Sequence, residues 1–426
     1  MGPELSRRDL VRLLGGSAAA LWLPRSGAAW TMPAPLAASP AVPDERFWAS
    51  VREQFVMPPD LAVMNAANLC PSSAPVLDAL YKATREMDRE PSPGYRSQME
   101  HAKEVTRRAL AEFLRVTPEE IVITRNTSES SNLVSSGLDL KAGDAVLLFS
   151  DNHPSNLVAW KEKAKRHGYR VDVVPVLSPH PGAEYYLDAF TKALTPQTKV
   201  LGFTHLTSTV GDLFPARELC RLARERDILT LVDGAQSFGL IDVDLREMDP
   251  DFYAGSGHKW PCGPKEAGVL FINQRSASRI WPSIYSAYPG AVGISKSFES
   301  FGQRDEPAIQ ALGEALQFQT KVGRKAIEAR GRELAQALMA GLRKLPEVKV
   351  WTHADPARSL AVVSLQPGTL DPVKLTHALY EKDRIVCATR PGADRGGVRF
   401  SPHFYNSHAE VERVVAALGR YLAAGL

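Results

Sequence analysis

The sequence predicts an α/β protein, with a mostly parallel, doubly wound sheet followed by a smaller α+β region. Two observations predict this class. Between residues 119 and 272, apolar strand-like runs alternate with helix-like segments, an order typical of parallel strands joined by right-handed crossovers. After a long helical stretch, Ala308 to Leu345, short strands and helices are mixed, and an amphipathic helix spans Ser407 to Ala424. We expect a large domain over residues 44–310, whose first residues pack with a small domain over residues 311–426.

Composition limits the possible partners. The 426 residues are 44% hydrophobic, which is enough for a large core. The net charge is only +3, from 51 Lys and Arg against 48 Asp and Glu, so a nucleic acid or an anionic membrane is not expected as a partner. The four cysteines are scattered, without a C-x-x-C pair or a histidine cluster at ligand spacing, so neither a metal site nor a disulfide framework is predicted.

The N-terminal segment has the pattern of an export signal. Arg7 and Arg8 precede a short apolar run from Leu13 to Leu23, and a Pro- and Ala-rich stretch continues to Pro43. The run is shorter than the about 20 residues that a membrane helix needs, so no stable membrane insertion is expected. The pattern resembles a twin-arginine signal, which predicts that residues 1–43 are a signal peptide and linker for export to the periplasm. A basic helix with frayed ends is the alternative.

The individual elements follow from hydrophobic periodicity and from turn residues. The sequence PSPGYR separates the first two long helices and predicts a loop that contains Arg96. The side chain of Arg96 is either exposed to solvent or directed toward the active site. We expect helices at Ser73–Met87, Ser97–Leu114, Tyr186–Leu194, Pro215–Asp227 and Pro372–Lys382, and strands at Glu119–Thr124, Ala145–Ser150, Arg170–Val176, Lys199–Leu206, Ile228–Asp233, Gly268–Ile272, Val348–Trp351, Leu360–Leu365, Ile385–Thr389 and Val398–Phe400.

The segment from Ile228 to Ile272 contains residue types suited to pyridoxal phosphate. An apolar run ends in Asp233, and a second short strand ends in Ser-Gly-His-Lys, at Lys259. A lysine can hold the cofactor aldehyde as a Schiff base, and a buried carboxylate can keep the pyridine nitrogen protonated, so that the ring withdraws electrons from the substrate. Each residue alone has an ordinary explanation, as a turn aspartate or a surface lysine. Their combination predicts a pyridoxal phosphate site.

The set Asp233, Gln236, Ser256, His258 and Lys259 resembles the signature of the class V aminotransferase family, which includes cysteine desulfurases and isopenicillin N epimerase-like proteins. The resemblance covers residues 44–426. It implies the fold of a fold type I pyridoxal phosphate-dependent transferase, attachment of the cofactor to Lys259, and cofactor contacts from the other four residues.

Further cofactor contacts are expected at strand ends. The start of a hydroxyl-rich helix at Thr127 and Ser128 offers free backbone N–H groups and the positive end of a helix dipole, although an ordinary capping box would look the same. The family resemblance implies that these two residues hold the cofactor phosphate. It also implies that His153 stacks on the pyridine ring, and that Thr207 reaches the phenolic oxygen beside Gln236.

The C-terminal region adds a candidate for substrate binding. The sequence GVRFSPHFYNS resembles a family segment and implies that Arg399 binds the substrate's α-carboxylate, since a planar guanidinium pairs with a carboxylate through two hydrogen bonds. The segment Ser295–Ala308 resembles one that reaches the partner subunit's site, which implies a homodimer with shared active sites. The usual Gly-Thr of that segment is here Gly302-Gln303, so the role of Gln303 stays open.

The family resemblance also includes a departure. Cysteine desulfurases have a nucleophilic cysteine in a loop shortly before the carboxylate-binding arginine, whereas here the loop between Thr389 and Arg399 contains none. Cys387 falls in the preceding strand and is expected to be a core residue.

We therefore expect a pyridoxal phosphate-dependent enzyme that acts at Cα of an amino acid or amine, with Lys259 moving the proton. Transamination is the main expectation, and epimerisation or β-elimination is the alternative. A non-catalytic binding protein is disfavoured because Lys259 and Asp233 are both intact. A nicotinamide dehydrogenase is disfavoured because no strand is followed by G-x-G-x-x-G.

Overall fold

The computed structural model describes residues 32–392 and 394–426. The predicted signal, with Arg7 and Arg8, lies outside the described residues. All the elements below belong to one unit, residues 34–426. Within the described chain, no helix combines the length and the hydropathy needed to cross a bilayer.

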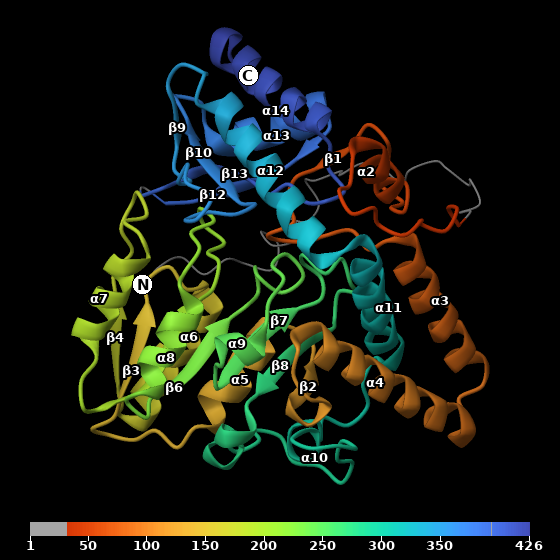
Figure 1. The fold of residues 1–426 in the computed structure, drawn as a ribbon, viewed down its shortest axis with the longest axis vertical. Coiled ribbons are helices and arrows are strands. Elements are labelled where there is room, and N and C mark those ends of the chain that lie inside the picture. Colours follow the sequence, from red (N-terminus) through yellow and green to blue (C-terminus); the bar gives the residue numbers. More distant parts are fainter. Residues whose placement is uncertain (1–31, 393) are drawn as a thin grey trace, which may run out of the picture. The chain divides into compact units, whose positions relative to one another are not determined.

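The central element is a seven-stranded sheet with the strand order β2-β8-β7-β6-β5-β3-β4 (Figure 1). The strands from β7 to β4 are parallel, and β8 is antiparallel to both of its neighbours, so the predicted mostly parallel α/β sheet is confirmed. The strands are β2 (Ile121–Thr124), β3 (Ala145–Phe149), β4 (Arg170–Val174), β5 (Thr198–Thr204), β6 (Leu229–Asp233), β7 (Phe252–Ser256) and β8 (Gly268–Ile272).

Helices cover both faces of this sheet, because alternate side chains of a strand point to opposite faces. In β3, Val146 and Leu148 belong to one apolar core, and Leu147 and Phe149 belong to another. The first core includes side chains of α5 (Thr127–Gly137) and α6 (Pro154–His167), and the second includes side chains of α4 (Pro93–Leu114), α7 (Ala183–Ala193), α8 (Ala216–Arg224), α9 (Leu245–Met248) and α11 (Glu306–Val322).

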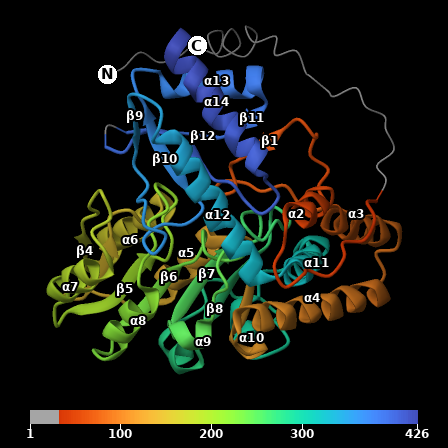
Figure 2. The same cartoon turned by 45° about the horizontal axis from the view of Figure 1, so that its top comes forward.

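A second, antiparallel sheet of four strands, in the order β12-β13-β10-β9, lies in the C-terminal region (Figure 2). The short strand β1 (Ala62–Val63) pairs in parallel with β11 (Ile385–Val386), so the chain that follows α2 (Glu45–Arg52) is attached to this region. The other elements here are β9 (Val348–Val350), β10 (Val363–Pro367), β12 (Ala388–Arg390), β13 (Gly397–Phe400), α12 (Arg324–Leu342), α13 (Pro372–Asp383) and α14 (His408–Ala424); α3 (Ala74–Arg89) and α10 (Ser295–Phe298) lie elsewhere in the unit.

The structure divides one predicted helical stretch in two and contradicts the predicted position of Arg96. The helical stretch expected from Ala308 to Leu345 consists of two helices, α11 and α12, because Gly323 between them adopts a φ of 98°, which a glycine tolerates without a steric penalty. Arg96, expected in a loop, lies in the first turns of α4 with an exposed side chain. That helix starts early because Ser92 caps it and Pro93 occupies its first turn.

Candidate active site

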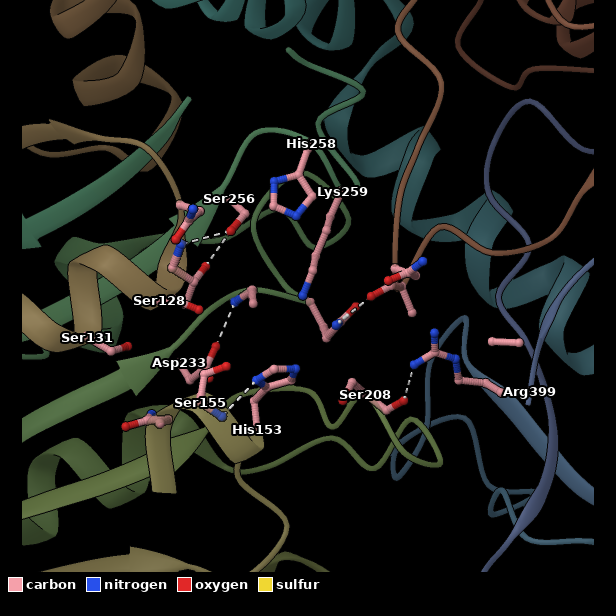
Figure 3. Close-up of a pocket in the computed structure, with 18 of the residues that line it drawn as sticks. Ser128, Ser131, His153, Ser155, Ser208, Asp233, Ser256, His258, Lys259 and Arg399 are labelled. Carbon is pink, nitrogen blue, oxygen red and sulfur yellow. Dashed lines mark hydrogen bonds between the residues drawn. The ribbon is translucent and has the colours of Figure 1, made fainter. Parts of the chain in front are cut away.

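A cavity of about 470 Å³ contains the predicted cofactor-binding and catalytic residues apart from Thr207. Its walls come from the ends of β6 and β7, the first turns of α5 and α6, and the strands β12 and β13 of the second sheet (Figure 3). This is the carboxyl edge of the parallel strands, where open α/β sheets bind ligands. The lining residues are Ala67, Asn68, Asn126, Thr127, Ser128, Ser131, His153, Ser155, Asn156, Ser208, Asp233, Ala235, Gln236, Ser256, His258, Lys259, Ala388, Thr389, Arg390 and Arg399.

Lys259 and Asp233 face this cavity from the carboxyl ends of two adjacent strands. Asp233 is the last residue of β6 and is only 3% exposed, and its Oδ1 accepts a hydrogen bond from the backbone N–H of Ala235 at 3.0 Å. Lys259 follows β7, and its amine points into the cavity (Figure 3). The pKa of Lys259 is lowered to about 8, mainly by burial; the charge of Asp233 opposes this shift, and that of Arg399 adds to it. At pH 7 about a tenth of the amine is therefore unprotonated, far more than for an ordinary lysine, and this is the state in which it is a nucleophile or a base.

The start of α5 forms a polar corner of the cavity. The backbone N–H of Thr127 donates to Ser256 Oγ at 2.9 Å, and the two hydroxyls are 2.7 Å apart. Two other polar side chains of the cavity, Ser131 and Asn156, are buried, and their hydroxyl and amide atoms have no hydrogen-bond partner in the described chain. Unpaired donors beside a helix N-terminus fit a phosphate, because the Ser131 hydroxyl and the Asn156 Nδ2 could donate to the ligand's oxygens. This corner therefore fits the phosphate of the predicted cofactor.

Two histidines line the cavity. His153 is the N-cap of α6, and its Nδ1 accepts a hydrogen bond from the backbone N–H of Ser155 at 3.3 Å. Burial lowers the pKa of His153, and the charge of Lys259 lowers it further. Burial likewise lowers the pKa of His258 to about 4, with contributions from Lys259 and Lys265. Both rings are thus mainly neutral at neutral pH, and a flat neutral ring suits stacking on an aromatic cofactor.

Gln236 lines the cavity, and two hydrogen bonds to other residues of the protein fix its side-chain amide. Its Nε2 donates to the carbonyl oxygen of Ala67 at 3.0 Å, and its Oε1 accepts from Trp260 Nε1 at 2.7 Å. The amide orientation is therefore fixed before any ligand binds.

Thr207, predicted to contact the cofactor, is not among the cavity-lining residues. Its side chain is fully buried, and its hydroxyl accepts a hydrogen bond from the backbone N–H of Asp212 at 2.9 Å. The next residue, Ser208, lines the cavity instead.

Two arginines of the second sheet complete the cavity. Arg399 on β13 is 5% exposed and donates to the carbonyl oxygen of Ser208 at 2.7 Å and to Asn65 Oδ1 at 3.3 Å. Burial lowers its pKa to about 10, and the charge of Arg390 acts in the same direction. Arg390 on β12 forms no ion pair within the described chain. Asp151, whose charge acts on Arg390, is paired instead with Arg395, at an N–O distance of 3.3 Å. The two guanidinium groups make this wall attractive to a carboxylate.

No thiol lines the cavity in the described part of the chain. Cys387 lies between β11 and β12, is buried, and has a pKa raised to about 12 by burial. A thiol in this environment stays protonated and is a poor nucleophile.

The structure adds Ser131, Asn156, Ser208 and Arg390 to the residues expected from the sequence. Ser131 could have been inferred, since it lies one helical turn after Thr127 and therefore on the same face of α5. Asn156 carries a similar signal, three residues after His153 at the start of α6, whereas Ser208 and Arg390 carry none. Gln303, whose role was left open, is exposed and donates to Glu306 at 3.5 Å.

Comparisons with known proteins match most of the chain. The family described as "Aminotransferase class-V" matches residues 71–414. The isopenicillin N epimerase of Amycolatopsis lactamdurans is 33% identical over 87% of this chain and 98% of that protein, and the enzyme of the same name from Streptomyces clavuligerus is 30% identical over 87% and 97%. A probable cysteine desulfurase of Xylella fastidiosa is 31% identical over 74% of this chain and 79% of that protein.

Solved structures agree with these relatives. A variant of the protein C-DES, with glycine covalently linked to its pyridoxal phosphate cofactor, superposes with a TM-score of 0.79 and 25% identity, covering 86% of this chain and 98% of that one. A complex of a cystine C–S lyase with its product, cysteine persulfide, gives a TM-score of 0.78 and 26% identity, covering 85% and 98%.

Proposed function

Because the chain belongs to the class V aminotransferase family of pyridoxal phosphate-dependent enzymes, we propose that it removes the α-proton of an amino acid in the cavity beside Lys259. The observation that carries the proposal is the meeting in one cavity of Lys259, Asp233 and Arg399. These residues provide an amine that is partly neutral at physiological pH, a buried carboxylate, and a guanidinium for the substrate's carboxylate.

Each group has a separate task. When bound, pyridoxal phosphate supplies an electron-withdrawing ring that stabilises the charge developing at Cα. The phosphate would be held by the start of α5 with Thr127, Ser131 and Asn156, and Asp233 would hold the proton of the pyridine nitrogen. Arg399 would bind the α-carboxylate and thereby fix which bond at Cα faces Lys259. The amine of Lys259 would take the proton and deliver it to the next position.

The destination of that proton defines the reaction. Two relatives that match over nearly their whole length are isopenicillin N epimerases, and this supports return of the proton to Cα with inversion. Transamination, in which a keto acid leaves, is the second candidate, and the description of the matched family supports it. The lowered pKa of Lys259 suits both, since each needs the amine first as a base and then as an acid.

Sulfur transfer to a protein thiol is less well supported, although several relatives are named cysteine desulfurases. That reaction needs a nucleophilic cysteine that reaches the substrate, and the thiol of Cys387 is buried with a raised pKa. Cleavage of a C–S bond by β-elimination needs no such thiol and is therefore included in the test below.

The test is to incubate the holoenzyme in D₂O with a panel of L-amino acids and with isopenicillin N. Loss of the α-proton is followed by NMR, and chirality, keto acid, ammonia and sulfide are measured in parallel. Epimerisation exchanges the α-proton and produces the opposite isomer without keto acid, whereas transamination produces stoichiometric keto acid. Lys259→Ala should abolish exchange, and Lys265→Ala serves as the matched control. Lack of exchange with every compound in the panel would refute the proposal.

A homodimer is also proposed. Four large side chains are clustered in sequence and exposed, Trp281, Ile284, Tyr285 and Tyr288, with exposed fractions of 45–72%. Exposed apolar clusters commonly mark association surfaces. Sedimentation should give a dimer for the wild type and a monomer for a variant with Tyr285→Asp and Tyr288→Asp.

A further inference from the structure

Two cysteines and a histidine meet in a buried cluster outside the cavity. Cys70, Cys262 and His403 are 0%, 1% and 0% exposed, and each offers one ligand atom within 4.8 Å of the other two. The three residues come from distant parts of the chain: the segment after β1, the turn after Lys259, and the segment after β13. The sequence predicts no metal site because it contains no local pair at ligand spacing, and only the fold brings these residues together.

One of the two ring nitrogens of His403 has no hydrogen-bond partner in the described chain. Its Nε2 is 2.8 Å from the carbonyl oxygen of Trp260, and because a carbonyl can only accept, Nε2 carries the proton. The other nitrogen, Nδ1, therefore has a free lone pair, and it has no hydrogen-bond partner in the described chain. Metal-binding histidines commonly have this arrangement, with the second ring nitrogen donating to a backbone carbonyl that fixes the ring.

We propose that Cys70, Cys262 and His403 bind one Zn²⁺ ion. Two thiolates and an imidazole form a ligand set that zinc favours. Binding forms two Zn–S bonds and one Zn–N bond, and the two thiol protons leave to solvent. The charges of Zn²⁺ and two thiolates cancel, so the buried site carries no net charge, whereas Cu⁺ would leave a negative charge that burial disfavours.

Tyr405 is the candidate for the fourth ligand. Its hydroxyl oxygen is 3.7 Å from Cys70 Sγ. Ligands at about 2.3 Å (sulfur) and 2.1 Å (oxygen) from a tetrahedral zinc ion are about 3.6 Å apart, so the observed separation fits neighbouring ligands. The side chain of Tyr405 is buried, and its phenol can bind as a neutral donor without adding charge.

The site would connect the parts of the chain that carry the catalytic groups. Cys262 N donates to the carbonyl oxygen of Lys259 at 2.9 Å, and Cys70 N donates to that of His258 at 2.9 Å. His403 follows β13, the strand that carries Arg399. A zinc ion bound here would fix the turn that contains the lysine to the end of the strand that contains the arginine. We assign the ion a structural role, since none of its ligands lines the active-site cavity.

Metal analysis of the full-length holoenzyme, purified without a metal-affinity tag, tests the site directly. We expect about one zinc ion per chain after dialysis, as structural zinc sites bind tightly. X-ray absorption at the zinc edge should show two sulfur atoms at about 2.3 Å and nitrogen or oxygen at about 2.0–2.2 Å. A strong chelator should lower Tm, and Zn²⁺ but not Mg²⁺ should restore it.

Variants locate the ion. His403→Gln and Cys262→Ser should each reduce the zinc content at least tenfold. Cys220→Ser is the matched control, and this variant should retain the ion. Cys220 is also a buried, free cysteine, but it lies in the core of the large sheet that contains Leu147 and Phe149. Absence of zinc after incubation with Zn²⁺, stoichiometric copper in its place, or a coordination shell without sulfur would each overturn the proposal. The absorption measurement needs only the wild type, so it decides even if a variant does not fold.

Discussion

Replacing Arg399 with alanine should remove the substrate's carboxylate contact while leaving the cofactor in place. The guanidinium is 5% exposed, and Nε has no partner within the described chain, so part of its hydrogen-bonding capacity is free to bind a ligand. The groups expected to hold the cofactor, including Thr127, Asn156 and Asp233, come from the seven-stranded sheet and its helices, whereas Arg399 comes from the second sheet.

The size of the effect follows from the hydrogen bonds that are lost. A hydrogen bond to a charged group contributes about 1.5–3 kcal/mol, so a bidentate pair lost in a buried site costs about 3 kcal/mol or more. Each 1.4 kcal/mol corresponds to about a tenfold change. We therefore expect kcat/KM for amino acids to fall by roughly 10²-fold or more. Arg399→Lys should recover only part of this loss, because an ammonium group cannot form the planar pair.

The assay compares each amino acid with its decarboxylated amine, and cofactor content is read from the absorption spectrum. If Arg399 binds the α-carboxylate, the variant should lose activity toward the amino acid and little toward the amine. Arg390→Ala is the matched control, since it removes the other cavity arginine. Equal losses for amino acid and amine, loss of the cofactor, or a larger carboxylate-specific loss in Arg390→Ala would refute the assignment.

The remaining predictions concern Lys259, Cys387 and the N-terminal arginines. Borohydride reduction of the holoenzyme, followed by peptide mass mapping, should place the pyridoxyl group on Lys259 and on no other lysine. In the cofactor-free protein, the lowered pKa of Lys259 (about 8, against 10.5 ordinarily) makes its charged form unfavourable in the folded state. Lys259→Met should therefore raise Tm below pH 8, and the gain should shrink between pH 8 and 10.5, where the unfolded wild type binds more protons than the folded protein; a constant gain would contradict this. Cys387→Ala should leave any sulfide release from cysteine unchanged, and mass spectrometry should find no persulfide on Cys387. Replacing Arg7 and Arg8 by lysine should keep the protein in the cytoplasm, as fractionation would show, and unchanged export would remove the argument for a twin-arginine route.

The sequence by itself determined the central sheet and the cofactor-binding core. Hydrophobic periodicity is a local property, so the alternation of strands and helices was readable without tertiary information. The same holds for Asp233, which ends a buried strand, and for Lys259, which follows the next one, because adjacent parallel strands bring their carboxyl ends to one edge. Gly323 shows a limit of the local pattern: the stretch from Ala308 to Leu345 is helical as expected, but the backbone of Gly323 divides it into two helices.

Only the tertiary structure decided which distant residues share a site. Arg390 faces the cavity because the second sheet lies over the carboxyl edge of the first, and no local pattern encodes that packing. Thr207 and Ser208 differ by one position, yet only Ser208 lines the cavity, since the hydroxyl of Thr207 is taken up by the turn to Asp212. Likewise Cys70 and Cys262 lack ligand spacing in the sequence, and their thiols meet because folding joins segments that the chain separates. Contacts of this kind depend on long-range packing, whereas periodicity and strand-end motifs depend on neighbours a few residues away.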